Sequence, residues 1–122
     1  MAYGEELILD LHECNVDTFN RNSLEAYFKG ICKEIDMQRC ELFFWDDLET
    51  PEDEKQTEDH TIGTTAVQFI LTSNITIHAL DKLKKVFVNI FSCKPFDASR
   101  ARHFTQEWFG GKVVSSTIVR RL

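Results

Sequence analysis

The sequence lacks the features of several large protein classes. No apolar run approaches the length of a membrane span, and residues 1–6 lack the basic and apolar segments of a secretory signal. We therefore expect a cytoplasmic protein that does not bind membranes. The chain also contains no internal repeat, low-complexity tract or linker, so its 122 residues are predicted to form one domain, residues 1–122.

Zinc-binding patterns are missing as well. The four cysteines form no C-x-x-C pair, and none has a histidine at zinc-finger spacing. We therefore expect no metal site and, in a cytoplasmic protein, reduced thiols. Cys14, Cys32 and Cys40 are predicted to be small buried apolar residues, the usual place of a free cysteine.

Positive charge is also in short supply. The net charge is −6, which argues against a general nucleic-acid binder because such proteins need a basic face. The acid is concentrated between Asp46 and Asp59, where eight carboxylates face the single Lys55. This pattern favours a solvated acidic loop over a field that attracts a cationic ligand. Its role is left open.

Hydrophobic periodicity predicts the secondary structure. A helix is expected over residues 23–36 with its N-cap at Asn22-Ser23, and a second helix is expected between Asp97 and Gly110-Gly111. Alternating apolar residues predict strands over 7–11, 40–45, 65–73 with its continuation 74–78, 85–93, and 112–122.

The order of these elements predicts the fold class. Several strands in the middle of the chain follow one another through short connections, which favours antiparallel pairing. Two amphipathic helices suffice to cover one face of such a sheet. We therefore expect an α+β two-layer sandwich, a mainly antiparallel sheet covered on one face by two helices.

Three segments share their pattern with one enzyme family. Ser73 is followed by the alternating Ile75-Thr76-Ile77 and then by His78. The predicted strand Val88–Cys93 ends in Phe-Ser-Cys, and the segment Leu9–Cys14 also ends in cysteine. In order and spacing these segments resemble the processing motif and neighbouring strands of the small S-adenosylmethionine decarboxylases of bacteria and archaea. The likeness covers nearly the whole chain.

The resemblance implies that the chain cuts itself. In the family the serine that matches Ser73 attacks the preceding carbonyl, here that of Thr72, and the backbone breaks between residues 72 and 73. The serine then becomes a pyruvoyl group, the only cofactor that the resemblance implies. The family assigns the proton transfer in this step to the histidine that matches His78, a residue type suited to it by its pKa.

The resemblance also implies how such an enzyme works. The pyruvoyl ketone forms a Schiff base with the substrate amine and takes up the electrons released with carbon dioxide. The family assigns protonation of the resulting carbanion to the cysteine that matches Cys93. It further implies a homodimer that acts on a small-molecule substrate, with active sites at or near the contact between protomers.

Four further positions are expected to contribute. The resemblance implies that Thr65 and Thr72 support processing, through a hydroxyl and through the scissile carbonyl. Trp45 falls near the aromatic residue that stacks on adenine, and Asp81 is expected to supply, from a displaced position, the carboxylate that helps to hold the nucleoside. The chain departs from the family pattern at Thr72, usually glutamate, at Asn74, usually histidine, and at Ala79-Leu80-Asp81-Lys82, usually Thr-Trp-Pro-Glu.

Three hypotheses therefore remain open from the sequence. The first is a pyruvoyl-dependent lyase that decarboxylates S-adenosylmethionine for spermidine biosynthesis. The second keeps the chemistry but changes the substrate to a basic amino acid, ornithine or arginine. The third is an uncleaved homologue that binds a nucleoside or a partner protein, or that regulates a true decarboxylase by pairing with it. Activation by a polyamine is left open in all three.

Overall fold

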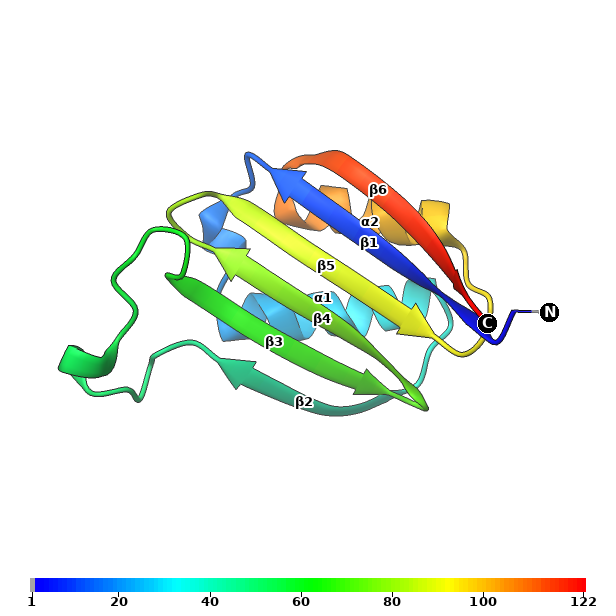
Figure 1. Ribbon diagram of the computed structural model, residues 1–122, viewed down its shortest axis with the longest axis horizontal. Helices are drawn as coiled ribbons and strands as arrows, with labels where there is room; N and C mark the ends of the chain where they lie inside the picture. Colours follow the sequence, from blue (N-terminus) through cyan, green and yellow to red (C-terminus); the bar gives the residue numbers. More distant parts are fainter. Residues whose placement is uncertain (1) are drawn as a thin grey trace.

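The computed structural model describes residues 2–122, which form six strands, two α-helices and two short 3-10 helices (Figure 1). In chain order the elements are β1 (Gly4–His12), η1 (Val16–Thr18), α1 (Arg21–Glu34), β2 (Arg39–Trp45), η2 (Glu52–Glu54), β3 (Gly63–Ile70), β4 (Ser73–Leu80), β5 (Lys85–Ser92), α2 (Ala98–Phe109) and β6 (Lys112–Arg121).

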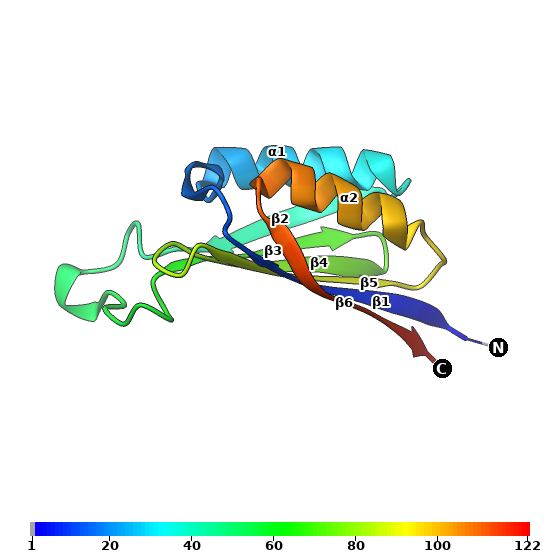
Figure 2. The same ribbon diagram turned by 90° about the horizontal axis from the view of Figure 1, so that it is seen from above.

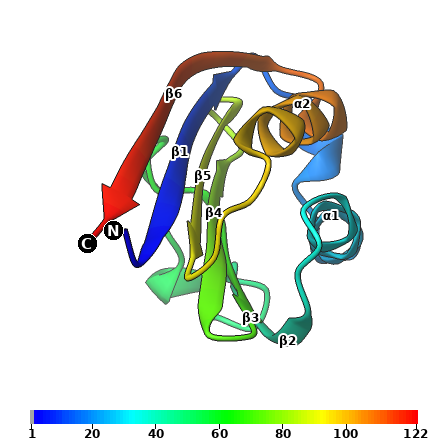
Figure 3. The same ribbon diagram turned by 90° about the vertical axis from the view of Figure 1, so that its right-hand side faces the viewer.

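The strands form one antiparallel sheet in the order β2-β3-β4-β5-β1-β6. Both helices lie on the same face of this sheet, as the views from above and from the end show (Figures 2 and 3). The other face carries no element of the described chain, and we call it the open face. The expected α+β two-layer sandwich is therefore confirmed.

The core lies between the sheet and the helices. Every second side chain of the central strands points into it, as the alternation in the sequence predicts. Its fully buried members include Leu7, Leu9, Leu11, Ile75, Ile77, Ala79, Val86, Val88 and Ile90 from the sheet and Leu24, Tyr27, Phe28 and Ile31 from α1. The Tyr27 hydroxyl lies 2.7 Å from Thr105 Oγ1, which joins α1 to α2 inside this core.

The first helix begins earlier than expected. Asn20, and not Asn22-Ser23, is its N-cap, because the Asn20 side chain accepts a hydrogen bond of 2.9 Å from the Ser23 N–H. The helix ends at Glu34, and Asp36 then takes a left-handed backbone (φ 57°) that an α-helix cannot continue. Neither α-helix within residues 2–122 is long and apolar enough to cross a membrane. The cytoplasmic location stays a prediction.

The second helix follows its prediction closely. Asp97 caps α2 by accepting a hydrogen bond of 2.9 Å from the Arg100 N–H. Gly110 ends the helix with a left-handed backbone (φ 64°), the conformation that glycine adopts at least cost.

The long strand predicted over residues 65–73 is interrupted. It ends at Ile70, the next strand begins at Ser73, and Leu71 and Thr72 form the turn between them. Neither is a typical turn residue, so composition gave no sign of this break. The turn is tight enough to place Thr72 at φ 61°.

One cysteine prediction is wrong. Cys14 and Cys32 are buried, but Cys40 is only half-buried. It lies on β2, an edge strand whose register against β3 shifts between Arg39 and Leu42. The fully buried Gln68 stabilises this irregular stretch, because its amide donates to the Cys40 and Glu41 carbonyls at 3.0 and 3.2 Å.

The acidic segment forms the mostly exposed loop between β2 and β3, which extends away from the sheet (Figure 1). Its base is attached to α1 by a two-pronged ion pair, in which Arg21 Nε and a terminal guanidinium nitrogen donate to Asp46 at 2.6 and 2.8 Å. This contact with Arg21 lowers the pKa of Asp46 below its usual range.

Candidate active site

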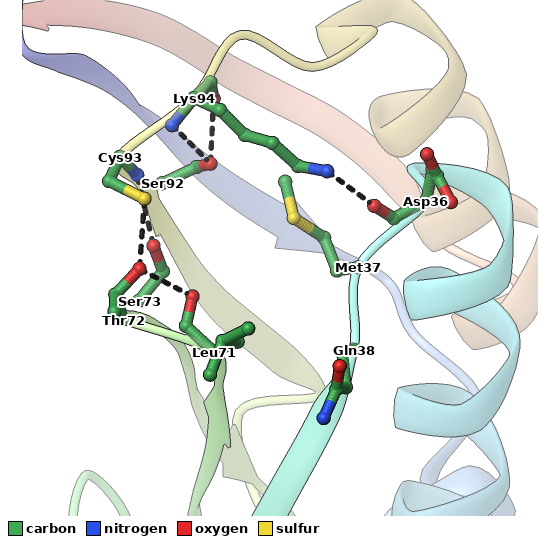
Figure 4. A pocket seen from close by; sticks show the side chains of 9 residues that line it. All are labelled: Asp36, Met37, Gln38, Leu71, Thr72, Ser73, Ser92, Cys93 and Lys94. Atoms are coloured by element: carbon green, nitrogen blue, oxygen red, sulfur yellow. Dashed lines mark hydrogen bonds between the residues drawn. The ribbon is translucent and has the colours of Figure 1, made fainter.

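Three of the expected site residues meet at the turn between β3 and β4 (Figure 4). The Cys93 N–H donates a hydrogen bond of 2.9 Å to Ser73 Oγ. The Thr72 Oγ1 atom lies 3.0 Å from Cys93 Sγ. The register of β4 and β5, which pairs Asn74 with Phe91, brings these distant positions together. We call Thr72, Ser73 and Cys93 the turn cluster.

The turn cluster lines a cavity of about 460 Å³. Its other walls come from the connection after α1, at Asp36, Met37 and Gln38, and from Lys94 after β5. Lys94 Nζ donates a hydrogen bond of 2.9 Å to the Asp36 carbonyl, so the Lys94 side chain joins two walls of the cavity (Figure 4). A small molecule in this cavity therefore reaches both the Ser73 hydroxyl and the Cys93 thiol.

The thiols of the chain differ in acidity. Hydrogen bonds from Thr72 and, to a smaller extent, Ser73 lower the pKa of Cys93. Burial raises the pKa of Cys14 and of Cys32 to about 11 in each case. Cys93 is thus an accessible thiol suited to proton transfer, whereas Cys14 and Cys32 are packing residues.

The residue that precedes the bond expected to break has a strained backbone. Thr72 has a left-handed backbone (φ 61°), which is unusual for any residue other than glycine and more so for a β-branched one. Strain of this kind costs on the order of 1–3 kcal/mol and clusters at functional sites. Because Thr72 directly precedes Ser73, this strain lies at the peptide bond that is expected to be cut, where its release would favour cleavage.

A second group of predicted residues lies at the opposite end of the sheet. Trp45 pairs with Thr65 across β2 and β3, and Thr65 pairs with His78 across β3 and β4. All three side chains therefore share the open face, and Thr65 Oγ1 lies 3.1 Å from His78 Nδ1. We call Trp45, Thr65 and His78 the face cluster.

Asp81 lies at the same end, just after β4. Its N–H donates a hydrogen bond of 3.1 Å to the Ile62 carbonyl. Its side chain lines a second cavity, of about 370 Å³, together with Asp46 and Asp47 of the acidic loop. Partial burial raises the pKa of Asp81 above its usual value.

Within one chain the turn cluster and the face cluster are separated. Ser73 and His78 lie five positions apart on β4, a span of about 16 Å at strand geometry. An odd separation also directs their side chains to opposite faces of the sheet. The structure therefore brings Ser73, Thr72 and Cys93 together, and it places His78, Thr65 and Trp45 elsewhere.

The sequence analysis missed some residues at the site. Lys94 follows Cys93 directly in the sequence, so its positive charge beside a predicted site thiol was the signal that could have identified it. Asp36, Met37 and Gln38 gave no signal, because only the tertiary fold brings the end of α1 next to residues far along the chain.

Comparisons with known proteins agree with the fold and with the family that the sequence resembles. Residues 5–122 match the family model of S-adenosylmethionine decarboxylase. The fold is similar to the crystal structure of the adenosylmethionine decarboxylase from Aquifex aeolicus VF5, with a TM-score of 0.76 over 98% of this chain and 91% of that chain. The identity to that protein is 18%, so this likeness concerns the fold alone. No curated protein sequence matches significantly. Because the family model covers nearly all of it, the chain belongs to the S-adenosylmethionine decarboxylase family.

Proposed function

We propose that the protein is a pyruvoyl-dependent decarboxylase of S-adenosylmethionine, which supplies spermidine biosynthesis and makes its own cofactor by cutting between Thr72 and Ser73. The observation that carries the proposal is the turn cluster, in which a serine, a strained preceding residue and an accessible thiol are in contact. Membership of the family supports the same conclusion.

The chain's own residues support the cutting step. The Cys93 N–H donates to Ser73 Oγ and so leaves the hydroxyl proton free to depart when the oxygen attacks the Thr72 carbonyl. Thr72 is exposed at the turn, so water has access to the bond that is cut. Strain at Thr72 is relieved when the bond breaks.

The residues around position 73 fit a pyruvoyl group. Ser73 is the residue type from which this group forms, and the Cys93 N–H that binds its oxygen would face the group. When present, the group supplies an electron sink for the loss of carbon dioxide. Cys93 is the acid in our proposal, because its thiol borders both position 73 and the cavity.

A homodimer would complete this site. The open face exposes large apolar side chains, among them Phe43, Trp45 and Phe69 with exposed fractions of 59%, 50% and 43%. An uncovered apolar face of this kind marks an interaction surface. We infer that two copies pack through their open faces about a two-fold axis that runs across the strands.

Such an axis exchanges the two ends of the sheet. It places the partner's His78 and the partner's Thr65 above the end that carries Ser73, and the partner's Trp45 above the same end of the sheet, over β2. The separation of about 16 Å within one chain then has a simple explanation, because the turn cluster and the face cluster act in different protomers. We infer that the partner's His78 approaches the backbone of residue 73 from the open face, opposite the Ser73 side chain, and removes its Cα proton.

The substrate needs its own test, because Asp81 and the neighbouring acidic loop line a cavity that also suits a basic amino acid. Intact mass under denaturing conditions should show two fragments, residues 1–72 and 73–122. Carbon dioxide release is then measured in parallel with S-adenosylmethionine, ornithine and arginine, with Ser73→Ala as the control. Carbon dioxide release from S-adenosylmethionine alone supports the proposal. Release from ornithine or arginine alone would show that the substrate is a basic amino acid instead. A stable uncut chain without turnover would favour a binding or regulatory homologue.

A further inference from the structure

We propose that Thr72 is a positioning residue for the Cys93 thiol in both states of the protein: its hydroxyl holds the thiol beside the bond to be cut, and its new terminal carboxylate faces the same thiol afterwards and keeps it protonated. The second half rests on the proposed function, and the first half concerns the intact chain alone.

The contacts of the Thr72 hydroxyl carry the first half. Thr72 Oγ1 lies 3.0 Å from Cys93 Sγ and donates a hydrogen bond of 2.7 Å to the Leu71 carbonyl. A hydroxyl has one proton and two lone pairs. It can therefore accept from the protonated thiol while it donates to Leu71, or it can turn and donate to the thiolate. The same side chain suits both protonation states of the thiol.

The backbone fixes this contact. The residues on both sides of the scissile bond touch the same cysteine, Thr72 through its hydroxyl and Ser73 through the Cys93 N–H. The left-handed conformation of Thr72 belongs to a tight turn whose ends are held by the pair Ile70 and Ser73. The pairing register of β3 and β4 therefore determines where the Thr72 hydroxyl lies relative to the Cys93 thiol.

Cutting changes the chemistry of Thr72. Attack of Ser73 Oγ on the Thr72 carbonyl converts the amide to an ester and frees the nitrogen. Loss of the Cα proton then breaks the ester's bond to the serine Cβ, which releases the Thr72 carboxylate and leaves dehydroalanine. One water hydrolyses the tautomeric imine to the pyruvoyl group and ammonia. The net change consumes one water, releases one ammonia and leaves a carboxylate at residue 72.

The new carboxylate acts on the thiol in the opposite direction from the hydroxyl. A terminal carboxyl has a pKa of about 3.5 and is ionised at neutral pH. A negative charge beside a thiol disfavours the thiolate. In the intact chain the hydrogen bond from Thr72 lowers the pKa of Cys93 instead. The cut therefore converts a more acidic thiol into one that stays protonated, which is the form that a proton donor requires.

Other charges near the thiol stay the same when the chain is cut. Lys94 favours the thiolate, and its Nζ is bound to the Asp36 carbonyl. The Asp36 carboxylate lines the same cavity, and the nearby Glu5 accepts a hydrogen bond from the Phe96 N–H. Ser73 also lowers the pKa of Cys93, but Ser73→Ala and the cut protein both lack the Ser73 hydroxyl. A difference in thiol acidity between these two proteins therefore reports on residue 72.

The test measures how alkylation of Cys93 by iodoacetamide depends on pH, with the site located by peptide mass spectrometry. Three uncut proteins, Ser73→Ala alone and combined with Thr72→Val or Thr72→Ser, are compared with the cut wild-type protein. Valine matches threonine in shape and β-branching but lacks the hydroxyl. Thr61→Val in the Ser73→Ala protein is the matched control, because Thr61 also bonds a carbonyl in an exposed turn.

We expect the alkylation midpoint to rise with Thr72→Val and to return with Thr72→Ser, while Thr61→Val leaves it unchanged. The cut wild-type protein should have a midpoint about one pH unit above that of Ser73→Ala, a tenfold smaller thiolate fraction at a given pH. Equal midpoints with and without Thr72→Val would overturn the first half. A cut protein with a midpoint at or below that of Ser73→Ala would overturn the second. A wild-type chain that never cuts contradicts the proposed function and the second half with it, while the uncut variants still decide the first.

Discussion

Thr65 and His78 face each other across β3 and β4, with Thr65 Oγ1 3.1 Å from His78 Nδ1, at the end of the sheet that lies away from Ser73. The hydroxyl orients the imidazole, but the ring cannot reach position 73 of its own chain. Under the proposed function this separation makes the dimer a condition for cutting, and the first two predictions below depend on it.

Two inactive variants should restore each other. Ser73→Ala lacks the attacking hydroxyl, and His78→Ala lacks the base, so each alone should cut at least about 100-fold more slowly than the wild type. In a mixed dimer the His78→Ala chain keeps its Ser73 and receives the partner's His78. We expect fragments of that chain when the two variants are co-expressed with different tags and analysed by mass spectrometry.

Two results would contradict this arrangement. If His78→Ala alone cuts at the normal rate, His78 has no role in cutting. A mixed dimer that forms without any cutting would place His78 in the same chain as the serine that it serves.

Loss of the open-face contact should also prevent cutting. Phe43 of the edge strand β2 is exposed beside Phe69 of β3 on the open face, with the ring centroids 6.1 Å apart. Phe43→Asp places a charge in the proposed interface, so sedimentation should show monomers and mass spectrometry an uncut chain. Val16→Asp is the matched control, because Val16 is exposed on η1 and not on the sheet. A monomeric wild-type protein that cuts itself would exclude the dimer.

Cys93 should matter for turnover more than for cutting. Cys93→Ser keeps the N–H that binds Ser73 but replaces the thiol with a much weaker acid. We expect fragments to form, while release of carbon dioxide from S-adenosylmethionine falls about 100-fold. The half-buried Cys40, replaced in the same way, serves as the control. Full turnover by Cys93→Ser would assign the proton to another group.

Backbone strain at Thr72 should accelerate cutting. Thr72→Gly adopts φ 61° without penalty, whereas Thr72→Val keeps the strain, and both lack the hydroxyl. We expect Thr72→Gly to cut about tenfold more slowly than Thr72→Val, the effect of about 1.4 kcal/mol on the barrier. In the uncut Ser73→Ala protein, urea unfolding should show Thr72→Gly to be about 1 kcal/mol more stable than Thr72→Val. Equal cutting rates would show that the strain is not used.

The ion pair at the base of the acidic loop should make stability depend on pH. The Asp46 side chain is only 7% exposed and its pKa is lowered by Arg21, so the pair stabilises the fold above the unfolded-state pKa. That stability is lost as the pH falls from about 4 through the lower pKa of the folded state.

Asp46→Asn should therefore lower the free energy of unfolding by about 1–2 kcal/mol at neutral pH, and the difference from the wild type should shrink in strong acid. Urea titrations across this range measure it. Glu25→Gln is the control, because its pair with Lys29 is exposed and 3.7 Å long, and it should cost no more than about 0.5 kcal/mol. A constant difference at every pH would attribute the effect to packing.

Local patterns were sufficient for much of the fold. The alternation in β1, β4 and β5 predicted the strands because one face of each is buried against the helices. Asp97 and Gly110 marked the ends of α2 because capping depends on residues close in sequence. The same rules failed at Leu71-Thr72, where the turn is imposed by pairing Ile70 with Ser73 and not by the preferences of its residues.

The sequence by itself determined the fold class, the family and the residue types of the site, because periodicity, capping and motif spacing are properties of neighbouring residues. The tertiary structure decided which of these residues meet. Antiparallel register put Cys93 against Thr72 and Ser73, and it paired Thr65 with His78 at the other end of the sheet. It also left one face of the sheet uncovered. Distances between strands and the direction of side chains across a sheet depend on the register of the whole fold, which no local pattern contains.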